Sequence, residues 1–165
     1  MMNTLQNQAR NLQRAAYELL YPSNDNNTLY AENFSRMNAK IFAQANRLYG
    51  THGKTLAEEA SICLALLMGY HATFCNAGKT VRVQNVLKRC WNILDRLPDS
   101  LLKVHLLAFC YSEVFDERLA AEAHAIMKNW SNRPLTSEEI EVMEMFEYME
   151  AETYPVSVLA DERFS

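Results

Sequence analysis

Residues 56–75 of the chain read LAEEASICLALLMGYHATFC and are apolar on almost every side of a helix. A helix that is apolar all round has to be covered by other elements on every side. Thr55 precedes this run and Glu58 follows three residues later, which is the spacing of a capping box. The segment therefore predicts a central helix, and we expect the rest of the chain to supply the helices that bury it.

Helical patterns continue on both sides of this segment. Between Lys79 and Leu97, apolar residues recur at steps of four and three, and similar stripes run through 116–130 and 138–149. Breaker stretches at 21–27, 49–54, 76–79, 97–100 and 131–134 are each short enough to join antiparallel helices. Further N-caps are predicted at Asp99, Asp116 and Thr136.

The sequence thus predicts an all-α fold, a single-domain bundle of about seven helices joined by short loops. The expected helices span residues 4–20, 32–49, 55–75, 79–96, 99–114, 117–130 and 136–151. The single helical domain is expected to cover residues 1–165, with 156–165 as a flexible tail after Pro155. No segment alternates in the manner of a strand next to a hairpin turn.

Composition places the chain among ordinary globular proteins of the cytoplasm. It has 165 residues, 49% hydrophobic and 22% charged, which is enough for one domain with a real core. There is no run of 18 apolar residues and no apolar signal segment at the N-terminus, so no membrane span is expected. The four cysteines form no CxxC pair and are predicted to be buried and reduced.

Charge is distributed unevenly along the chain. Residues 1–112 hold 12 Lys and Arg against 7 Asp and Glu, whereas residues 113–165 hold 4 against 13. The acidic excess is concentrated in one predicted helix, where the candidate partner-binding residues are Glu138, Glu141, Glu144, Glu147 and Glu150. Like charges at this spacing weaken an isolated helix, so the helix is either a solvated face held by its apolar stripe or a surface for a basic partner.

Arg82, Arg89 and Arg96 lie seven residues apart and form the opposite pattern, a cationic stripe interleaved with asparagines. The stripe is a second candidate for partner binding, and the alternative is a face that is solvated or paired within the chain. Three arginines without interleaved aromatic residues, in a chain of pI about 5.6, fall short of a nucleic-acid footprint.

Side chains capable of chemistry are present but do not form a recognised motif. His71 and Cys75 have the i, i+4 spacing of two metal ligands, but no second pair completes a site. There is no nucleophile elbow, no HExxH and no phosphate loop. We therefore expect no catalytic residue, no metal and no cofactor, with a metal-dependent or catalytic role for His71, Cys75 and Cys110 as the alternative.

Four stretches of the chain resemble the UpxZ family, small proteins encoded with capsular polysaccharide operons of gut bacteria. The resemblance is clearest over residues 31–155. The stretches are NFSRMNAKIFAQANRLYGTHG (33–53), EEASICLALLMGYHATFCNAGK (58–79), DSLLKVHLLAFCYSEVFDERLAAEAHAIMKNW (99–130) and LTSEEIEVMEMFEYMEAETYP (135–155).

The resemblance implies a regulatory protein and not an enzyme. UpxZ proteins antagonise UpxY proteins, NusG-like transcription anti-termination factors that let RNA polymerase read through the leader of a capsule operon. Each spares the UpxY of its own locus and inhibits those of other loci. The implied partners are therefore UpxY-type proteins, with RNA polymerase involved indirectly. A regulator that binds the leader RNA remains an alternative, against which the net charge of −4 argues.

Overall fold

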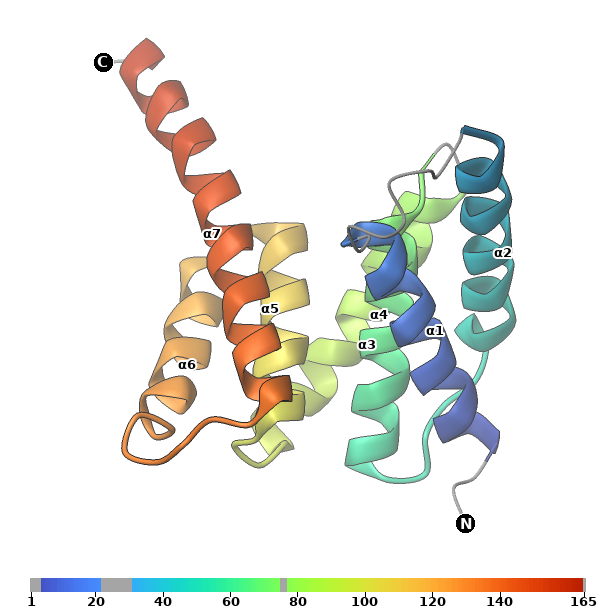
Figure 1. Cartoon of the computed structure of the whole chain (residues 1–165), viewed down its shortest axis with the longest axis horizontal. Helices are drawn as coiled ribbons and strands as arrows, with labels where there is room; N and C mark the ends of the chain where they lie inside the picture. Colours follow the sequence, from blue (N-terminus) through green and yellow to red (C-terminus); the bar gives the residue numbers. More distant parts are fainter. Residues whose placement is uncertain (1–3, 22–30, 75–76, 165) are drawn as a thin grey trace. The chain divides into compact units, whose positions relative to one another are not determined.

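The structure, a computed structural model, describes residues 4–21, 31–74 and 77–164, and for 31–33 and 152–164 only the backbone. Within these ranges all regular structure is helical and no strand is present. The helices are α1 (Thr4–Leu20), α2 (Ala31–Tyr49), α3 (Leu56–Ala72), α4 (Lys79–Ile93), the short 3-10 helix η2 (Leu94–Arg96), α5 (Leu101–Val114), α6 (Glu117–Lys128) and α7 (Ser137–Phe164) (Figure 1). The prediction of an all-α fold with seven helices is confirmed.

The chain divides into two compact units, residues 1–97 and residues 98–165. Unit 1 contains α1 to α4 and η2, and unit 2 contains α5 to α7. The division nearly follows the charge: unit 1 holds 11 Lys and Arg against 6 Asp and Glu, whereas unit 2 holds 5 against 14. The expectation that the two units form a single domain stays a prediction.

Helix α3 forms the centre of unit 1. It packs against α1, α2 and α4 (Figure 1). Every residue from Ile62 to Tyr70 is buried, so the helix has no solvent-facing side over these nine positions. The phenol of Tyr70 reaches the edge of this core and donates to Asn46 Oδ1 at 2.9 Å. The predicted central helix is therefore confirmed, and its all-round apolar sequence is explained by three covering helices.

Helix α5 has the corresponding place in unit 2. It packs against α6 and α7 and buries Val104 and the run from Leu106 to Tyr111 (Figure 1). Lys103 is also buried, at 5% exposure, and its ammonium lies 2.8 Å from the Glu122 carboxylate of α6. A buried ammonium needs such a partner, because burial without one is strongly unfavourable.

Two of the predicted helix starts differ in detail. Ser100, and not Asp99, caps α5, because its hydroxyl accepts the N–H of Lys103. Thr55 caps α3 as predicted by accepting the N–H of Glu58, but the Glu58 carboxylate accepts from Lys54 and not from Thr55. Side-chain caps stabilise these starts because the first N–H groups of a helix have no partner inside it.

Several helix ends also differ from the prediction, among them those of α3 and α7. Helix α3 ends at Ala72, three residues early, where Thr73 turns to an extended conformation. Helix α7 runs to Phe164, whereas the sequence predicted its end at residue 151. The presence of Pro155 favoured that earlier end, because proline has no N–H to donate to the preceding turn. The structure shows that the helix continues through this position.

Candidate functional site

Four of the five predicted glutamates of α7 follow one another at steps of three residues near its start. Glu138, Glu141, Glu144 and Glu147, called here the acidic face, are all exposed, and among the described residues none of them enters an ion pair. Two large side chains of the same segment are also exposed, Ile140 at 41% and Tyr148 at 56%. The helix thus presents carboxylates and apolar surface together, which is the combination that a protein partner can use.

Glu150, the fifth candidate, points to a different neighbour. Its carboxylate oxygens lie 2.8 and 3.0 Å from Nε2 of His124 on α6, and the His124 ring lies 5.1 Å from the ring of Phe146. Glu150 is only half-buried, but its carboxylate is engaged in joining α7 to α6. It therefore supports the placement of α7 more directly than it serves recognition.

The start of α7 is fixed by a group of hydrogen bonds among Arg133, Thr136 and Glu139, called here the clasp. This carboxylate accepts the N–H of Thr136 at 2.9 Å, while the Glu139 N–H donates to the Thr136 hydroxyl at 3.1 Å, as the capping-box sequence predicts. Arg133 adds two parallel hydrogen bonds at 2.8 and 2.6 Å. These bonds, the Arg133 pair foremost, lower the pKa of Glu139 to about 2.

The clasp predicts a specific pH dependence. The folded-state pKa of Glu139, about 2, lies below its ordinary value of 4.5, so the ionised form stabilises the fold above pH 4.5 and this contribution disappears as the pH falls towards 2. We expect Glu139→Gln to melt at a lower temperature than the unchanged chain at pH 7, with the two converging near pH 2. Glu138→Gln, on the exposed side, should follow the unchanged chain. If the melting temperatures of Glu139→Gln and the unchanged chain differ by the same amount at every pH, the low pKa of Glu139 is contradicted.

The predicted arginine stripe of α4 does not form one open surface. The Arg82 guanidinium lies 5.9 Å from the ring centroids of both Phe42 and Tyr49 and donates to the Ala77 carbonyl. Arg96, in η2, is exposed and donates to the carbonyl of Asn92. Both guanidinium groups remain close to solvent, but Arg82 is held against aromatic rings of α2.

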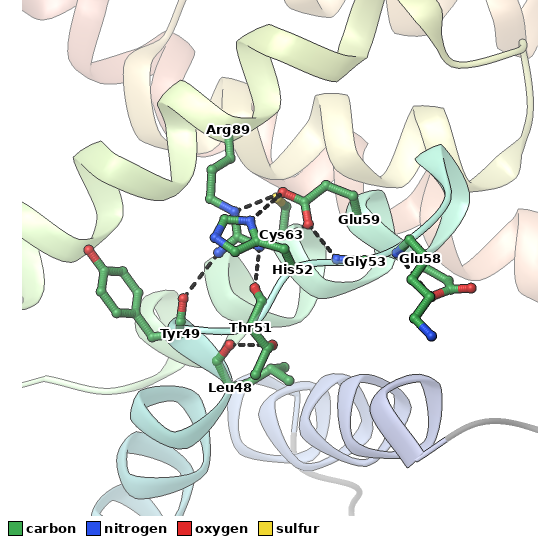
Figure 2. Close-up of polar contacts among 10 residues, drawn as sticks. Leu48, Tyr49, Thr51, His52, Gly53, Glu58, Glu59, Cys63 and Arg89 are labelled. Carbon is green, nitrogen blue, oxygen red and sulfur yellow. Dashed lines mark hydrogen bonds and ion pairs between the residues drawn. The ribbon is translucent and has the colours of Figure 1, made fainter.

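Arg89, the middle residue of the stripe, turns into a polar network within unit 1. Figure 2 shows its guanidinium between the Glu59 carboxylate of α3 and the loop that joins α2 to α3. It donates to Glu59 at 2.8 and 2.9 Å and to the carbonyls of Tyr49 and Thr51 at 3.1 and 2.6 Å. Both charged side chains are only 14% exposed. Arg89 is therefore paired within the chain, which was one of the alternatives for the stripe, and not open to a partner.

Glu59 completes this network from the other side. Its carboxylate also accepts the N–H of Gly53 at 2.9 Å and lies 3.5 Å from Nδ1 of His52 (Figure 2). Burial acts to raise the pKa of Glu59, but the hydrogen bonds from Arg89 and Gly53 outweigh it, and the pKa is lowered. The network therefore holds a charged pair that ties the loop at 50–54 to both α3 and α4.

The residues of the alternative chemical hypothesis do not assemble in the described part of the chain. His71 is exposed on α3, Cys110 is buried in α5, and Cys75 lies outside the described residues. Among the described residues no three His, Cys, Asp or Glu side chains are grouped to hold a metal ion. The same residues contain no helix that is both long and apolar enough to cross a membrane.

Two buried groups stay in their neutral forms. A hydrogen bond with Cys90, followed by burial, raises the pKa of the Cys63 thiol well above its ordinary range, so the thiol stays protonated. Burial lowers the pKa of His105 to about 4, which keeps its ring neutral at pH 7. Both residues are therefore suited to packing inside a helical core.

One exposed aromatic residue was not predicted from the sequence. Phe115 is large enough to anchor either a core or an interface, as are Tyr111, Phe109, Trp91 and Trp130. It is 54% exposed, and Val114 beside it is 41% exposed. Trp91 is also exposed, whereas the other three residues are buried. The Asp116 cap directly after Phe115 was the available signal, because it places Phe115 at the joint between two helices and outside both apolar stripes.

Comparison with known proteins gives a consistent family assignment. The sequence model of the UpxZ family, a family of transcription anti-terminator antagonists, matches residues 9–112. The chain is also similar to the crystal structure of a transcription anti-terminator antagonist UpxZ from Bacteroides uniformis ATCC 8492. The two share 40% sequence identity with a TM-score of 0.82, over 93% of this chain and 96% of that one. A search of curated proteins gave no match.

Proposed function

Because the chain belongs to the UpxZ family of transcription anti-terminator antagonists, we propose that it inhibits NusG-like UpxY factors of other capsular polysaccharide loci by binding them directly. Binding would act by competition: a helical protein that covers a surface needed for RNA polymerase or nucleic acid prevents anti-termination. The proposed role requires no bond-making step and no cofactor, and it belongs to the cytoplasm, where transcription takes place.

The acidic face of α7 is the observation that carries this proposal. It offers four carboxylates with no ion-pair partner among the described residues, with Ile140 and Tyr148 beside them. A protein surface that contacts nucleic acid is basic, so an acidic face is complementary to it. Carboxylates at such a surface give association rate and discrimination between related partners more than affinity.

The two candidate surfaces differ in where they lie relative to the family match. The family match covers residues 9–112 and ends within α5, so the acidic face lies outside it. The arginine stripe, in contrast, lies inside the matched segment, and its central residue Arg89 is engaged within unit 1. The acidic face is therefore the first choice and the stripe the second.

Charge reversal of the acidic face tests the proposal. We expect the quadruple change Glu138→Lys, Glu141→Lys, Glu144→Lys and Glu147→Lys to weaken UpxY binding at least tenfold, since each reversed charge opposes a basic partner at roughly 1 kcal/mol or more. Binding is measured by titration calorimetry and inhibition by a read-through transcription assay. Glu18→Lys with Asp95→Lys, two exposed acidic positions of unit 1, is the matched control and should retain both activities.

The outcome separates the proposal from its alternatives. If the quadruple variant binds and inhibits like the unchanged chain, the acidic face is not the contact surface. Binding to leader RNA without UpxY, with an affinity that falls steeply with salt, would favour an RNA-binding regulator instead. Stoichiometric zinc or iron in the purified protein would revive the metal-dependent alternative.

A further inference from the structure

Phe115 has an unusual backbone conformation at the joint between α5 and α6. Its φ of 56° places it in the left-handed region, and among the described residues it is the one non-glycine with positive φ. This region is unfavourable for a bulky residue, because its Cβ crowds the backbone, and helix ends of this kind usually carry glycine. The backbone role itself, an N–H donated to the Tyr111 carbonyl at 2.7 Å, would be served equally well by glycine.

The side chain of Phe115 adds a second unfavourable feature at the same position. Its ring meets the Tyr111 ring edge-on at 6.1 Å, but more than half of the side chain, 54%, stays exposed. Val114, the preceding residue, is 41% exposed. Exposed apolar side chains in pairs mark contact surfaces more often than isolated ones do. The joint thus combines backbone strain with exposed apolar area.

Phe115 is connected to the acidic helix through other rings of unit 2. The Tyr111 ring, which contacts Phe115, also meets Phe146 of α7 edge-on at 5.8 Å, and the next residue after Phe146 is Glu147 of the acidic face. Carboxylates flank the joint as well: Glu113 and Glu117 lie two residues to either side of Phe115, and Asp116, which follows it directly, is paired with the Arg118 guanidinium at 2.7 Å. The apolar joint therefore lies in acidic surroundings, within a unit that carries 14 acidic residues against 5 basic ones.

We propose that Phe115, with Val114, is the apolar anchor of the partner-binding surface of unit 2, and that its ligand is a basic protein surface with an apolar pocket for the ring. This inference rests on the proposed function and adds an apolar contact at Phe115 to the charged contact of the acidic face. Aromatic anchors of this kind dominate binding energy when a partner desolvates them, and a fixed backbone conformation limits the ordering that binding requires. The surrounding carboxylates select a partner surface of positive charge.

The test compares Phe115→Gly with the unchanged chain, using as probe the UpxY factor that binds the unchanged chain most tightly. Glycine keeps the backbone conformation and removes the ring. We expect binding to weaken by at least about tenfold, as for an interface anchor, while the melting temperature changes by only a few degrees. Val81→Ala, which shortens a 60% exposed side chain of unit 1, is the matched control and should bind normally.

Salt dependence provides a second readout that separates the ring from the charges. Because the ring is uncharged, Phe115→Gly should lower affinity equally at low and high salt, whereas reversal of the acidic face should flatten the salt dependence. If the variant loses thermal stability but its folded fraction binds normally, Phe115 serves only to pack on Tyr111 and the inference is wrong. If acidic-face reversal abolishes binding but Phe115→Gly does not, the inference about Phe115 is wrong and the proposed function stands. Failure of the unchanged chain to bind any UpxY removes both.

Discussion

Gly53→Ala is expected to lower the free energy of unfolding by about 3 kcal/mol, the upper range for an extra methyl group in a filled site. A Cβ at this position would lie 2.3 Å from the backbone N of Glu59 and 2.6 Å from the backbone C of Glu58. These are atoms of the first turn of α3, which cannot move aside without breaking the helix start. The Gly53 N–H bond to the Glu59 carboxylate would be lost as the loop shifts. Chemical denaturation of the full chain measures the effect.

Gly50→Ala is the matched control for this prediction. Gly50 lies three residues earlier in the same loop, and a Cβ there would meet no atom within 4 Å. Its φ is not in the left-handed region, so alanine can adopt the backbone conformation. We expect no loss of stability, and a gain of up to about 1 kcal/mol is possible because alanine restricts the unfolded chain. Equal effects of the two substitutions would contradict the close approach of the loop to α3.

Arg89→Met is expected to destabilise the fold by about 3 kcal/mol. The change leaves the Glu59 carboxylate buried without its cation and removes the donors to the carbonyls of Tyr49 and Thr51. Breaking one side of a buried pair typically costs about 3–5 kcal/mol, and the 14% exposure of both side chains places this pair at the lower end. Denaturant titration with the midpoint and slope fitted together gives the value.

A double substitution shows whether the uncompensated charge causes that loss. In Arg89→Met with Glu59→Gln no charge remains buried, and the glutamine amide oxygen can still accept the Gly53 N–H. We expect the double variant to recover most of the stability and to remain below the unchanged chain by about 1 kcal/mol, because two loop carbonyls lose their donor. If the double variant is as unstable as Arg89→Met, the uncompensated charge of Glu59 is not the main cause of the lost stability.

The helical architecture was predictable because its signals are local. The apolar run at 56–75 specified a covered helix, and the structure surrounds α3 with α1, α2 and α4. The clasp at Thr136 and Glu139 followed from a spacing of three residues. Pro155 misled the prediction because a local signal for a helix end can be overridden, and α7 continues to Phe164.

The polar contacts inside the units were less predictable because their partners are distant in sequence. Arg89 and Glu59 are 30 residues apart, and the sequence analysis singled out only Arg89, as part of a stripe. The Lys103 pair with Glu122 is another example, in which a charged residue lies at the apolar centre of unit 2. Only the packing of α3 on α4, and of α5 on α6, brings these charges together.

The acidic face was predictable as a cluster but not in its details. The sequence placed Glu138, Glu141, Glu144 and Glu147 in one helix at steps of three residues, and the structure leaves these four exposed. Nothing in that periodicity distinguished Glu150, whose carboxylate contacts His124 of a different helix. The sequence pattern did not predict the exposure of Phe115 either, because this exposure depends on where α5 ends and not on a repeat of apolar residues.

Co-purification of the chain with a panel of UpxY factors, from its own locus and from foreign loci, tests the central claim most directly. The account predicts that foreign UpxY factors are retained and that the UpxY of its own locus is not. Retention should be lost in the variant with four reversed glutamates and kept in the Glu18→Lys, Asp95→Lys control. Equal retention of every factor by the unchanged chain, or no retention of any, would contradict the account.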